Sequence, residues 1–267
     1  MNPAARRPPV ERGRQDGSER APVLLLPPSE GKADGGRRRA RAGTFDVALA
    51  DDRTVLLAAL ARAVGTPAGA AKVLGCRGDL LDRARAATAA LVIGDAPRLP
   101  AAERYTGVVW EHLGPLAAAD RTRVLVPSAV YGITTAADPI ADYRLKLSVT
   151  LPGLGRLDRF WTGRITPLLV RRTRRRVVVD LLPDEHARAI DWPALGEATD
   201  LVRVAFRRAD GAGAAGHAAK AAKGRFARVV LDHGLDAARA FAWEGWRAIP
   251  TGDAPDRLDA IDVVAPT

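Results

Sequence analysis

The chain has 267 residues, a hydrophobic content of 47% and a formal net charge of +10 at pH 7. This size allows one substantial hydrophobic core, and the positive charge favours either a polyanionic partner such as nucleic acid or a basic surface that serves only solubility. A single cysteine and four histidines exclude a disulfide framework and leave no Cys/His cluster at zinc spacing, so we expect neither a metal nor a cofactor.

The first 21 residues are rich in Arg, Pro, Gly, Glu and Ser and have almost nothing to bury. We therefore expect a disordered basic tail over residues 1–21 and one domain over residues 22–267. The tail lacks the apolar core of a signal peptide, and no apolar run along the chain approaches the roughly 20 residues of a membrane span. These features predict a cytoplasmic protein without a membrane partner, and they leave the oligomeric state open.

The run Val23–Leu26 is short, continuous and apolar, and prolines stop it, as expected of a buried strand that ends in a loop. The loop continues as Ser29-Glu30-Gly31-Lys32. Backbone N–H groups and a lysine at the end of a strand can bind phosphate, but the glycine spacing of a Walker A loop is missing. Ser29 and Lys32 therefore belong either to a phosphate-binding loop or to an ordinary solvated loop.

Apolar residues at helical spacing predict three helices, over Asp51–Val64, Pro67–Leu74 and Asp79–Leu91. The second and third are separated by Gly75-Cys76-Arg77-Gly78. Glycines in such a turn let the backbone come close to a phosphate, and the N-terminus of the following helix adds partial positive charge. Gly75, Arg77 and Gly78 are therefore candidates for a DNA-binding helix-hairpin-helix element, with a plain helix–helix turn as the alternative.

Strands and helices continue to alternate along the rest of the chain. Apolar and β-branched runs predict the strands Arg121–Val126, Val177–Leu182, Asp200–Arg207 and a closing strand Phe241–Ile249. A basic helix over His217–His233 is expected to stop at Gly234. The class is therefore mixed α/β (α+β), without an internal repeat.

Two segments could present cations to an anion. If Tyr143–Leu147 is extended, Arg144 and Lys146 share the face opposite the apolar side chains, and these two cations need either solvent or an anion. The basic helix carries Lys220, Lys223, Arg225 and Arg228 over a broad side that could track a phosphate backbone. The run Arg171–Arg176 is expected to be a solvated connector, because helices often end in cations.

Pro183-Asp184-Glu185-His186 follows a predicted strand, at the end where α/β sheets collect ligands. Two carboxylates beside a histidine could carry out acid–base chemistry or bind iron, although three consecutive residues rarely chelate one ion. Alternatively, Asp184 is the N-cap of a short helix through Ile190. Nucleophilic hydrolysis has little support, because no Gly-x-Ser-x-Gly, HExxH or CxxC motif is present.

Seven short segments, in this order, resemble the YaaA family over roughly Val23 to Ile249. They are Pro27–Lys32, which is close to the PPSEGK form of actinobacterial members, Tyr105–Val108, Leu125–Gly132 with Pro139–Leu145, Phe160-Trp161, Asp180–Ile190, Ala219–Phe226 and Trp243–Trp246.

The resemblance implies the YaaA-type "cantaloupe" fold, a single compact domain with a mixed central sheet and a helix-hairpin-helix element that falls on Gly75–Gly78 here. It further implies a peroxide-stress protein whose basic cleft binds double-stranded DNA without strong sequence preference and which helps to limit oxidative damage from iron and peroxide. The cleft residues that the family motifs carry over are Lys32, Arg144, Lys220 and Arg225.

Two functions therefore remain open. The first is DNA binding through the phosphate-binding candidates Lys32, Gly75, Arg77, Gly78, Arg144, Lys146, Lys220, Lys223 and Arg225. The second is an enzyme that modifies a nucleotide or small metabolite in the same polar region, with Ser29, Tyr131, Asp184 and Glu185 as candidate catalytic residues. The carboxylates favour the second function, because they repel DNA.

Overall fold

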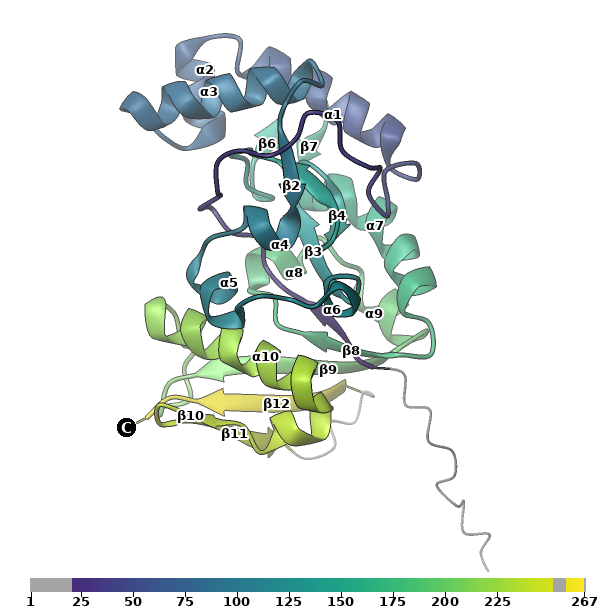
Figure 1. Ribbon diagram of the computed structural model, residues 1–267, viewed down its shortest axis with the longest axis vertical. Coiled ribbons are helices and arrows are strands. Elements are labelled where there is room, and N and C mark those ends of the chain that lie inside the picture. The colour runs from purple at the N-terminus through teal and green to yellow at the C-terminus, as the bar shows by residue number, and fades with distance from the viewer. Residues whose placement is uncertain (1–20, 252–257, 267) are drawn as a thin grey trace, which may run out of the picture.

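The computed structural model describes residues 21–251 and 258–266, and one mixed sheet of eight strands runs through it (Figure 1). In spatial order the strands are β10 (Ala242–Trp243), β11 (Trp246–Thr251), β12 (Leu258–Val264), β9 (Asp200–Arg207), β8 (Val177–Asp180), β1 (Val23–Leu25), β3 (Val124–Ser128) and β4 (Gly132–Thr135). The strands from β12 to β3 are parallel, and the pairings beyond them are antiparallel. The predicted mixed α/β class is confirmed.

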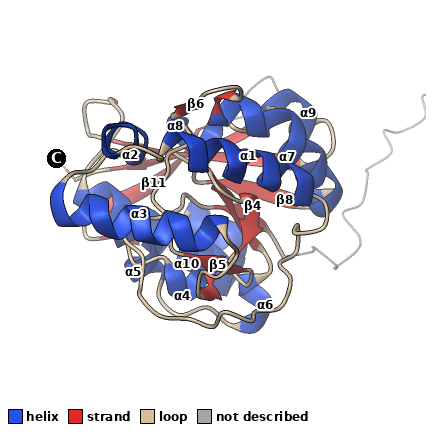
Figure 2. Cartoon of the chain, turned by 90° about the horizontal axis from the view of Figure 1, so that it is seen from above, coloured by secondary structure: helices blue, strands red, loops and turns tan. Residues whose placement is uncertain are grey.

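Helices cover both faces of this sheet. On one face lie α7 (Leu157–Thr173) and α9 (Trp192–Gly196), and on the other lie α5 (Val108–Leu113), α6 (Ala118–Arg121) and α10 (His217–Arg239) (Figures 1 and 2). At one end of the molecule α1 (Ala50–Ala63), α2 (Pro67–Leu74) and α3 (Gly78–Val92) form a separate helical layer.

The remaining elements are short. They are α4 (Ala101–Arg104), α8 (Asp184–Ala187), the pair β2 (Arg98–Pro100) with β5 (Pro139–Ala141), and the pair β6 (Thr150–Leu151) with β7 (Gly155–Arg156). Among the residues that the structure describes, none of the helices has the length and apolarity needed to cross a membrane. The tail predicted over residues 1–21 lies outside the described part of the chain except for Ala21.

β1 lies in the middle of the sheet, and the three consecutive leucines Leu24–Leu26 are fully buried because helices cover both sides. From β1 the chain moves to β3 on one side, and it later returns to β8 on the other side. The strand order therefore changes direction at β1. In open α/β sheets, ligands bind beyond the carboxyl ends of the strands at such a point.

The sequence predicted α1, α2, α3 and β9 closely, because their end signals are local. In α2 the Thr66 hydroxyl accepts a hydrogen bond from the Gly69 N–H at 3.1 Å, and Pro67 begins the helix. Gly75 ends it with a left-handed φ of 62°. The predicted arrangement of helix, glycine-containing turn and helix is confirmed.

Both predicted ends of β3 were wrong, since Arg121 ends helix α6 and the strand begins at Val124 and continues through Pro127 and Ser128. The Leu125 carbonyl accepts a hydrogen bond from the Leu26 N–H. The backbone nitrogen of Pro127, two residues further on, faces the same side of the strand. The pairing of β1 with β3 ends at Leu25, so the missing N–H of Pro127 leaves no ladder bond unmade.

The closing strand was also predicted incorrectly. The segment Phe241–Ile249 contains β10 and the start of β11, which are joined by Glu244 and Gly245 with φ values of 45° and 82°. Two consecutive positive φ values give the tight turn of a β-hairpin. The last strand is instead β12, which lies between β11 and β9. The predicted end of the basic helix is a kink, because α10 resumes after Gly234 and ends at Arg239.

Gly224 sets how closely α10 approaches α5. A β-carbon at this position would lie 2.4 Å from the carbonyl oxygen of Val109. Alanine is a better helix former than glycine by about 1 kcal/mol, yet we expect Gly224→Ala to lower the free energy of unfolding by about 1 to 3 kcal/mol through this overlap. Gly163→Ala, at an exposed helical position with no atom within 4 Å, should instead raise it by up to about 1 kcal/mol. Urea unfolding of both variants measures these changes. A change of the same sign in the free energy of unfolding of both variants would contradict the packing argument.

Candidate functional site

The loops that follow β1, β3 and β8 meet at the carboxyl edge of the sheet. They contain the segments 27–32, 129–131 and 181–186, so three of the sequence motifs converge where the strand order changes direction. The hairpin between α2 and α3 and the N-terminal half of α10 lie toward opposite ends of the molecule (Figure 1).

The loop after β1 is packed tightly against the segment Tyr105–Gly107. A β-carbon at Gly107 would lie 2.2 Å from the Ser29 hydroxyl oxygen, and the Thr106 N–H donates to the Gly31 carbonyl at 3.1 Å. The buried Arg104 guanidinium donates to the carbonyls of Ala33 and Gly35, which fixes the chain beyond Lys32. The loop is therefore held in one conformation against the edge of the hydrophobic core.

Lys32 turns inward from this loop. Its ammonium donates to the Ser29 carbonyl at 2.8 Å and lies 4.2 Å from the centre of the Tyr143 ring. Burial lowers the pKa of Lys32 to about 8, against the opposing effect of the nearby Asp142 carboxylate. The cation at the end of this loop is therefore half-buried over an aromatic face.

A chain of buried hydroxyls continues from Tyr143. The Ser128 hydroxyl donates to the Tyr143 oxygen at 2.9 Å, and the hydroxyls of Tyr143 and Tyr105 are 3.2 Å apart. Burial raises the pKa of Tyr143 to about 12 and that of Tyr105 well above its ordinary value. Both phenols are therefore protonated at neutral pH.

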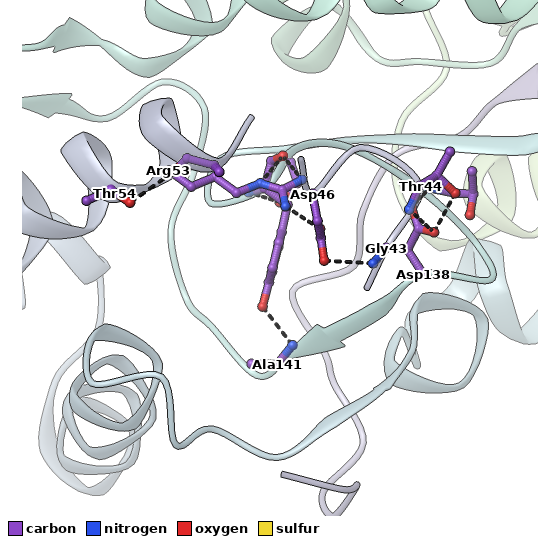
Figure 3. A network of polar contacts seen from close by, with 11 residues as sticks. Gly43, Thr44, Asp46, Arg53, Thr54, Asp138 and Ala141 are labelled. Carbon is purple, nitrogen blue, oxygen red and sulfur yellow. Dashed lines mark hydrogen bonds and ion pairs between the residues drawn. The ribbon is translucent and has the colours of Figure 1, made fainter. Parts of the chain in front are cut away.

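Tyr131, a candidate catalytic residue from the sequence, has a positioning role in this geometry. Its hydroxyl accepts the N–H of Ala141 at 2.8 Å, and its carbonyl accepts two bonds from Arg53 at 2.9 and 3.1 Å. Arg53 also pairs with Asp46, and Asp138 accepts the N–H and hydroxyl of Thr44 (Figure 3). This network fixes the backbone that leads to Tyr143.

The anion that pairs with Arg144 and Lys146 is a carboxylate of the same chain. Lys146 pairs with Glu30 at 2.8 Å and Arg144 pairs with the same carboxylate at 3.4 Å. The hydrogen bond from Lys146 lowers the pKa of Glu30, and the same bond raises the pKa of Lys146. The predicted alternation is confirmed, because Tyr143, Leu145 and Leu147 are buried.

Arg144 also reaches the hairpin, where its Nε donates to the carbonyl of Leu74 at 3.2 Å. Gly75 and Gly78 have φ values of 62° and 56°, and no atom lies within 4 Å of a β-carbon at either position. No side chain caps the N-terminus of α3, and Arg77 at that position is exposed. The turn therefore presents open backbone to solvent.

Lys223 is the second half-buried lysine. Burial lowers its pKa to about 8, opposed by the carboxylates of Asp180 and Asp184, and its ammonium lies 5.3 Å from the centre of the Phe206 ring. Asp180 accepts a bond from Arg203 at 3.1 Å, but burial still raises its pKa. Lys220 is exposed one turn earlier on α10.

The segment after β8 starts the short helix α8. Pro183 holds the N-cap position of α8, so the prediction of Asp184 as the N-cap was wrong. Glu185 accepts a bond from the Ser148 hydroxyl at 3.0 Å. Burial lowers the pKa of His186 to about 4, and its Nδ1 has no hydrogen-bond partner within the described chain. The imidazole is therefore neutral near pH 7.

These contacts link the two ends of the carboxyl edge. We call the set Lys223, Asp184, Glu185, Lys146, Glu30 and Arg144 the charged row. The Asp184 carboxylate favours the charged form of Lys223, and the Glu185 carboxylate favours that of Lys146. Glu30 forms ion pairs with both Lys146 and Arg144. The row runs from α10 to the end of α2.

Some sequence candidates stand apart from the charged row, and some of its neighbours were not predicted. Arg225 is exposed, and no hydrogen bond or ion pair of the described residues joins it to the row. Asp184, Glu185 and His186 form no metal-binding group, and no other such group of three His, Cys, Asp or Glu residues occurs in the ranges 21–251 and 258–266. Glu30 and Tyr105 were not singled out as site residues, although both lie inside motifs that the sequence identified.

This chain is similar to known proteins over most of its length. A family model described as "Peroxide stress protein YaaA" matches residues 23–250. A UPF0246 protein of Streptomyces coelicolor is 33% identical over 222 residues, which cover 79% of this chain and 84% of the relative. UPF0246 proteins of Corynebacterium glutamicum (30% over 220 residues, 78% and 84%) and Ruegeria sp. (31% over 169 residues, 57% and 67%) are also similar. The matched range contains the whole charged row.

Proposed function

The chain belongs to the YaaA family of peroxide stress proteins, and on that premise we propose that it binds double-stranded DNA without strong sequence preference and thereby helps to limit oxidative damage. The observation that carries the proposal is the open turn between α2 and α3 at the end of the charged row. Gly75 and Gly78 leave room for a phosphate to approach the backbone, and the uncapped N-terminus of α3 offers N–H groups and the positive end of a helix dipole.

Cations continue from this turn along the edge of the sheet. Arg77 is exposed at the turn, Arg144 and Lys146 follow, and Lys220 and Lys223 lie at the far end on α10. A duplex lying along this edge would meet several cations, with carboxylates between them. Contacts of this kind neutralise phosphates without reading bases, so they give affinity without sequence preference.

The carboxylate of Glu30 does not oppose this function strongly. Its side chain is 61% exposed, and it pairs with Lys146, whose side chain is 54% exposed. Exposed ion pairs contribute only about 0 to 1 kcal/mol, so an incoming phosphate can replace Glu30 at small cost. Asp184 is the less favourable group, because it lies beside Lys223 and repels a phosphate there.

We expect duplex affinity to fall steeply with salt, and the variant Arg77→Gln/Lys146→Gln to bind more weakly with a log–log salt slope that is shallower by about 1.8, because two phosphate contacts are lost. A matched control, Arg41→Gln/Arg247→Gln, removes the same charge from exposed positions outside the row. Fluorescence anisotropy with a labelled duplex at several salt concentrations gives both slopes. Binding that does not depend on salt, or equal slopes for the variant and the control, would contradict the proposal.

A second candidate function is the chemical modification of a nucleotide or small phosphorylated metabolite at the same edge. It is favoured by two half-buried lysines near carboxylates, Lys32 and Lys223, whose pKa values burial lowers to about 8, and by the neutral His186 near Lys223. A lysine with a lowered pKa gives up its proton more readily than a solvated lysine and is suited to proton transfer or nucleophilic attack, whereas a surface that only tracks phosphates does not need one.

A thermal-shift screen with nucleotides and divalent cations separates this candidate from DNA binding. A true ligand at 100 times its dissociation constant should stabilise the folded chain by about 2.7 kcal/mol, and Lys32→Met should abolish that stabilisation. Leu80→Met provides a control substitution at an exposed apolar position. If none of the compounds stabilises the wild-type chain, the enzymatic candidate loses its support.

A further inference from the structure

A second basic feature lies at the opposite, amino edge of the sheet, where α7 turns into β8. Arg171, Arg172, Arg174, Arg175 and Arg176 line an open hollow of about 720 Å³ there, without any other lining residue. The sequence predicted this run as a solvated connector, because helices often end in cations. The structure brings their side chains around one space.

The backbone holds the arginines in this arrangement. Thr173 is fully buried, and its hydroxyl donates to the Leu169 carbonyl at 2.8 Å, which anchors the end of α7. Arg175 then adopts a φ of 59°, and its N–H donates to the carbonyl of Ala198 at 3.3 Å. A left-handed conformation of a non-glycine residue costs about 1 kcal/mol or more and often accompanies a functional turn.

Two of the guanidinium groups are fixed to the amino ends of neighbouring strands. Arg172 donates to the Thr122 carbonyl just before β3, and Arg176 donates to the Ala21 carbonyl just before β1, both at 2.9 Å. Each contact uses only part of a guanidinium, which has five N–H donors. The Arg172 guanidinium therefore keeps further N–H donors that can bind an anion in the hollow.

Within the described chain, ion pairs do not balance the charge of four of these arginines. None of Arg171, Arg172, Arg174 and Arg175 has a carboxylate partner within 4.0 Å in the described chain. Asp200 lies nearby, since its N–H donates to the Arg176 carbonyl, but it does not line the hollow. The C-terminus of α7 supplies only about half a negative charge, which cannot neutralise these four cations.

We propose that this hollow binds a condensed polyphosphate anion, a chain of phosphates without attached nucleosides. Arginine forks match phosphate oxygens in bidentate geometry, and several forks around one space suit a ligand with several closely spaced charges. A nucleotide is a poorer fit, because no aromatic or aliphatic residue lines the hollow to receive its base or ribose. A membrane surface is also a poorer fit, because none of the large exposed hydrophobic residues belongs to the hollow. The proposal does not depend on DNA binding at the carboxyl edge.

Isothermal titration of the full chain with inorganic tripolyphosphate tests this site, with orthophosphate and ATP as comparison ligands. Tripolyphosphate should bind more tightly than either. The variant Arg171→Gln/Arg174→Gln/Arg175→Gln changes three exposed side chains and should weaken tripolyphosphate binding at least about tenfold, which corresponds to about 1.4 kcal/mol. The control Arg39→Gln/Arg41→Gln/Arg247→Gln removes the same charge from exposed positions elsewhere and should change the affinity by less than about twofold.

Three outcomes would overturn the proposal. Tripolyphosphate that fails to bind, or that binds the variant and the control equally, would make the run a solvated connector. ATP that binds as tightly as tripolyphosphate would indicate a nucleotide site. Loss of duplex affinity in the hollow variant, with tripolyphosphate binding unchanged, would assign the arginines to DNA. If the triple variant melts earlier than the wild-type chain, Arg175→Gly, which relieves the positive φ, provides the same comparison with one cation removed.

Discussion

The close packing of the loop after β1 against Tyr105–Gly107 is the contact on which the rest of the site depends. The Ser29 hydroxyl occupies the space that a β-carbon at residue 107 would need, so the loop can fold down only because that residue is glycine. Folding down turns the ammonium of Lys32 onto the Tyr143 ring. The same loop places Glu30 between Arg144 and Lys146 and so connects the sheet to the α2–α3 hairpin. The burial of Lys32 and the pairing of Arg144 and Lys146 with Glu30 thus depend on the same loop.

The two edges of the sheet differ in how their charge is arranged. At the carboxyl edge cations alternate with carboxylates, and two lysines are partly buried with pKa values of about 8. At the amino edge five arginines surround an open hollow without a carboxylate in its lining. The net charge of +10 therefore does not describe one uniform surface. The mixed carboxyl edge suits a ligand that is positioned and exchanged, whereas the arginine hollow suits a dense anion held by charge alone.

Features with local causes were predictable from the sequence, and features that join distant segments were not. Pro67 and Gly75 mark the ends of α2, and the apolar run Val23–Leu26 identifies the central strand. The pairing of Glu30 with Arg144 was not predictable, because it joins two loops whose approach depends on the strand order. Residues 171–176 illustrate the same limit, since their composition was evident but their convergence follows from the turn at Arg175 and from contacts near Ala21 and Thr122. The closing strand was missed because an internal hairpin was mistaken for one continuous strand.

The fold of the carboxyl edge half-buries Lys32 and Lys223, and titration of the lysine side chains measures the effect of this burial. The chain has only five lysines, so carbon-13 labelling of lysine gives signals that Lys→Arg variants can assign. Because burial disfavours the charged form, both ammonium groups should lose their protons with midpoints near pH 8. Below this pH, at neutrality, both should still be mainly charged. The signal of Lys146, which Glu30 stabilises as a cation, should change at higher pH than either. Midpoints for Lys32 and Lys223 at about 10.4, the value of a freely solvated lysine, would contradict the account.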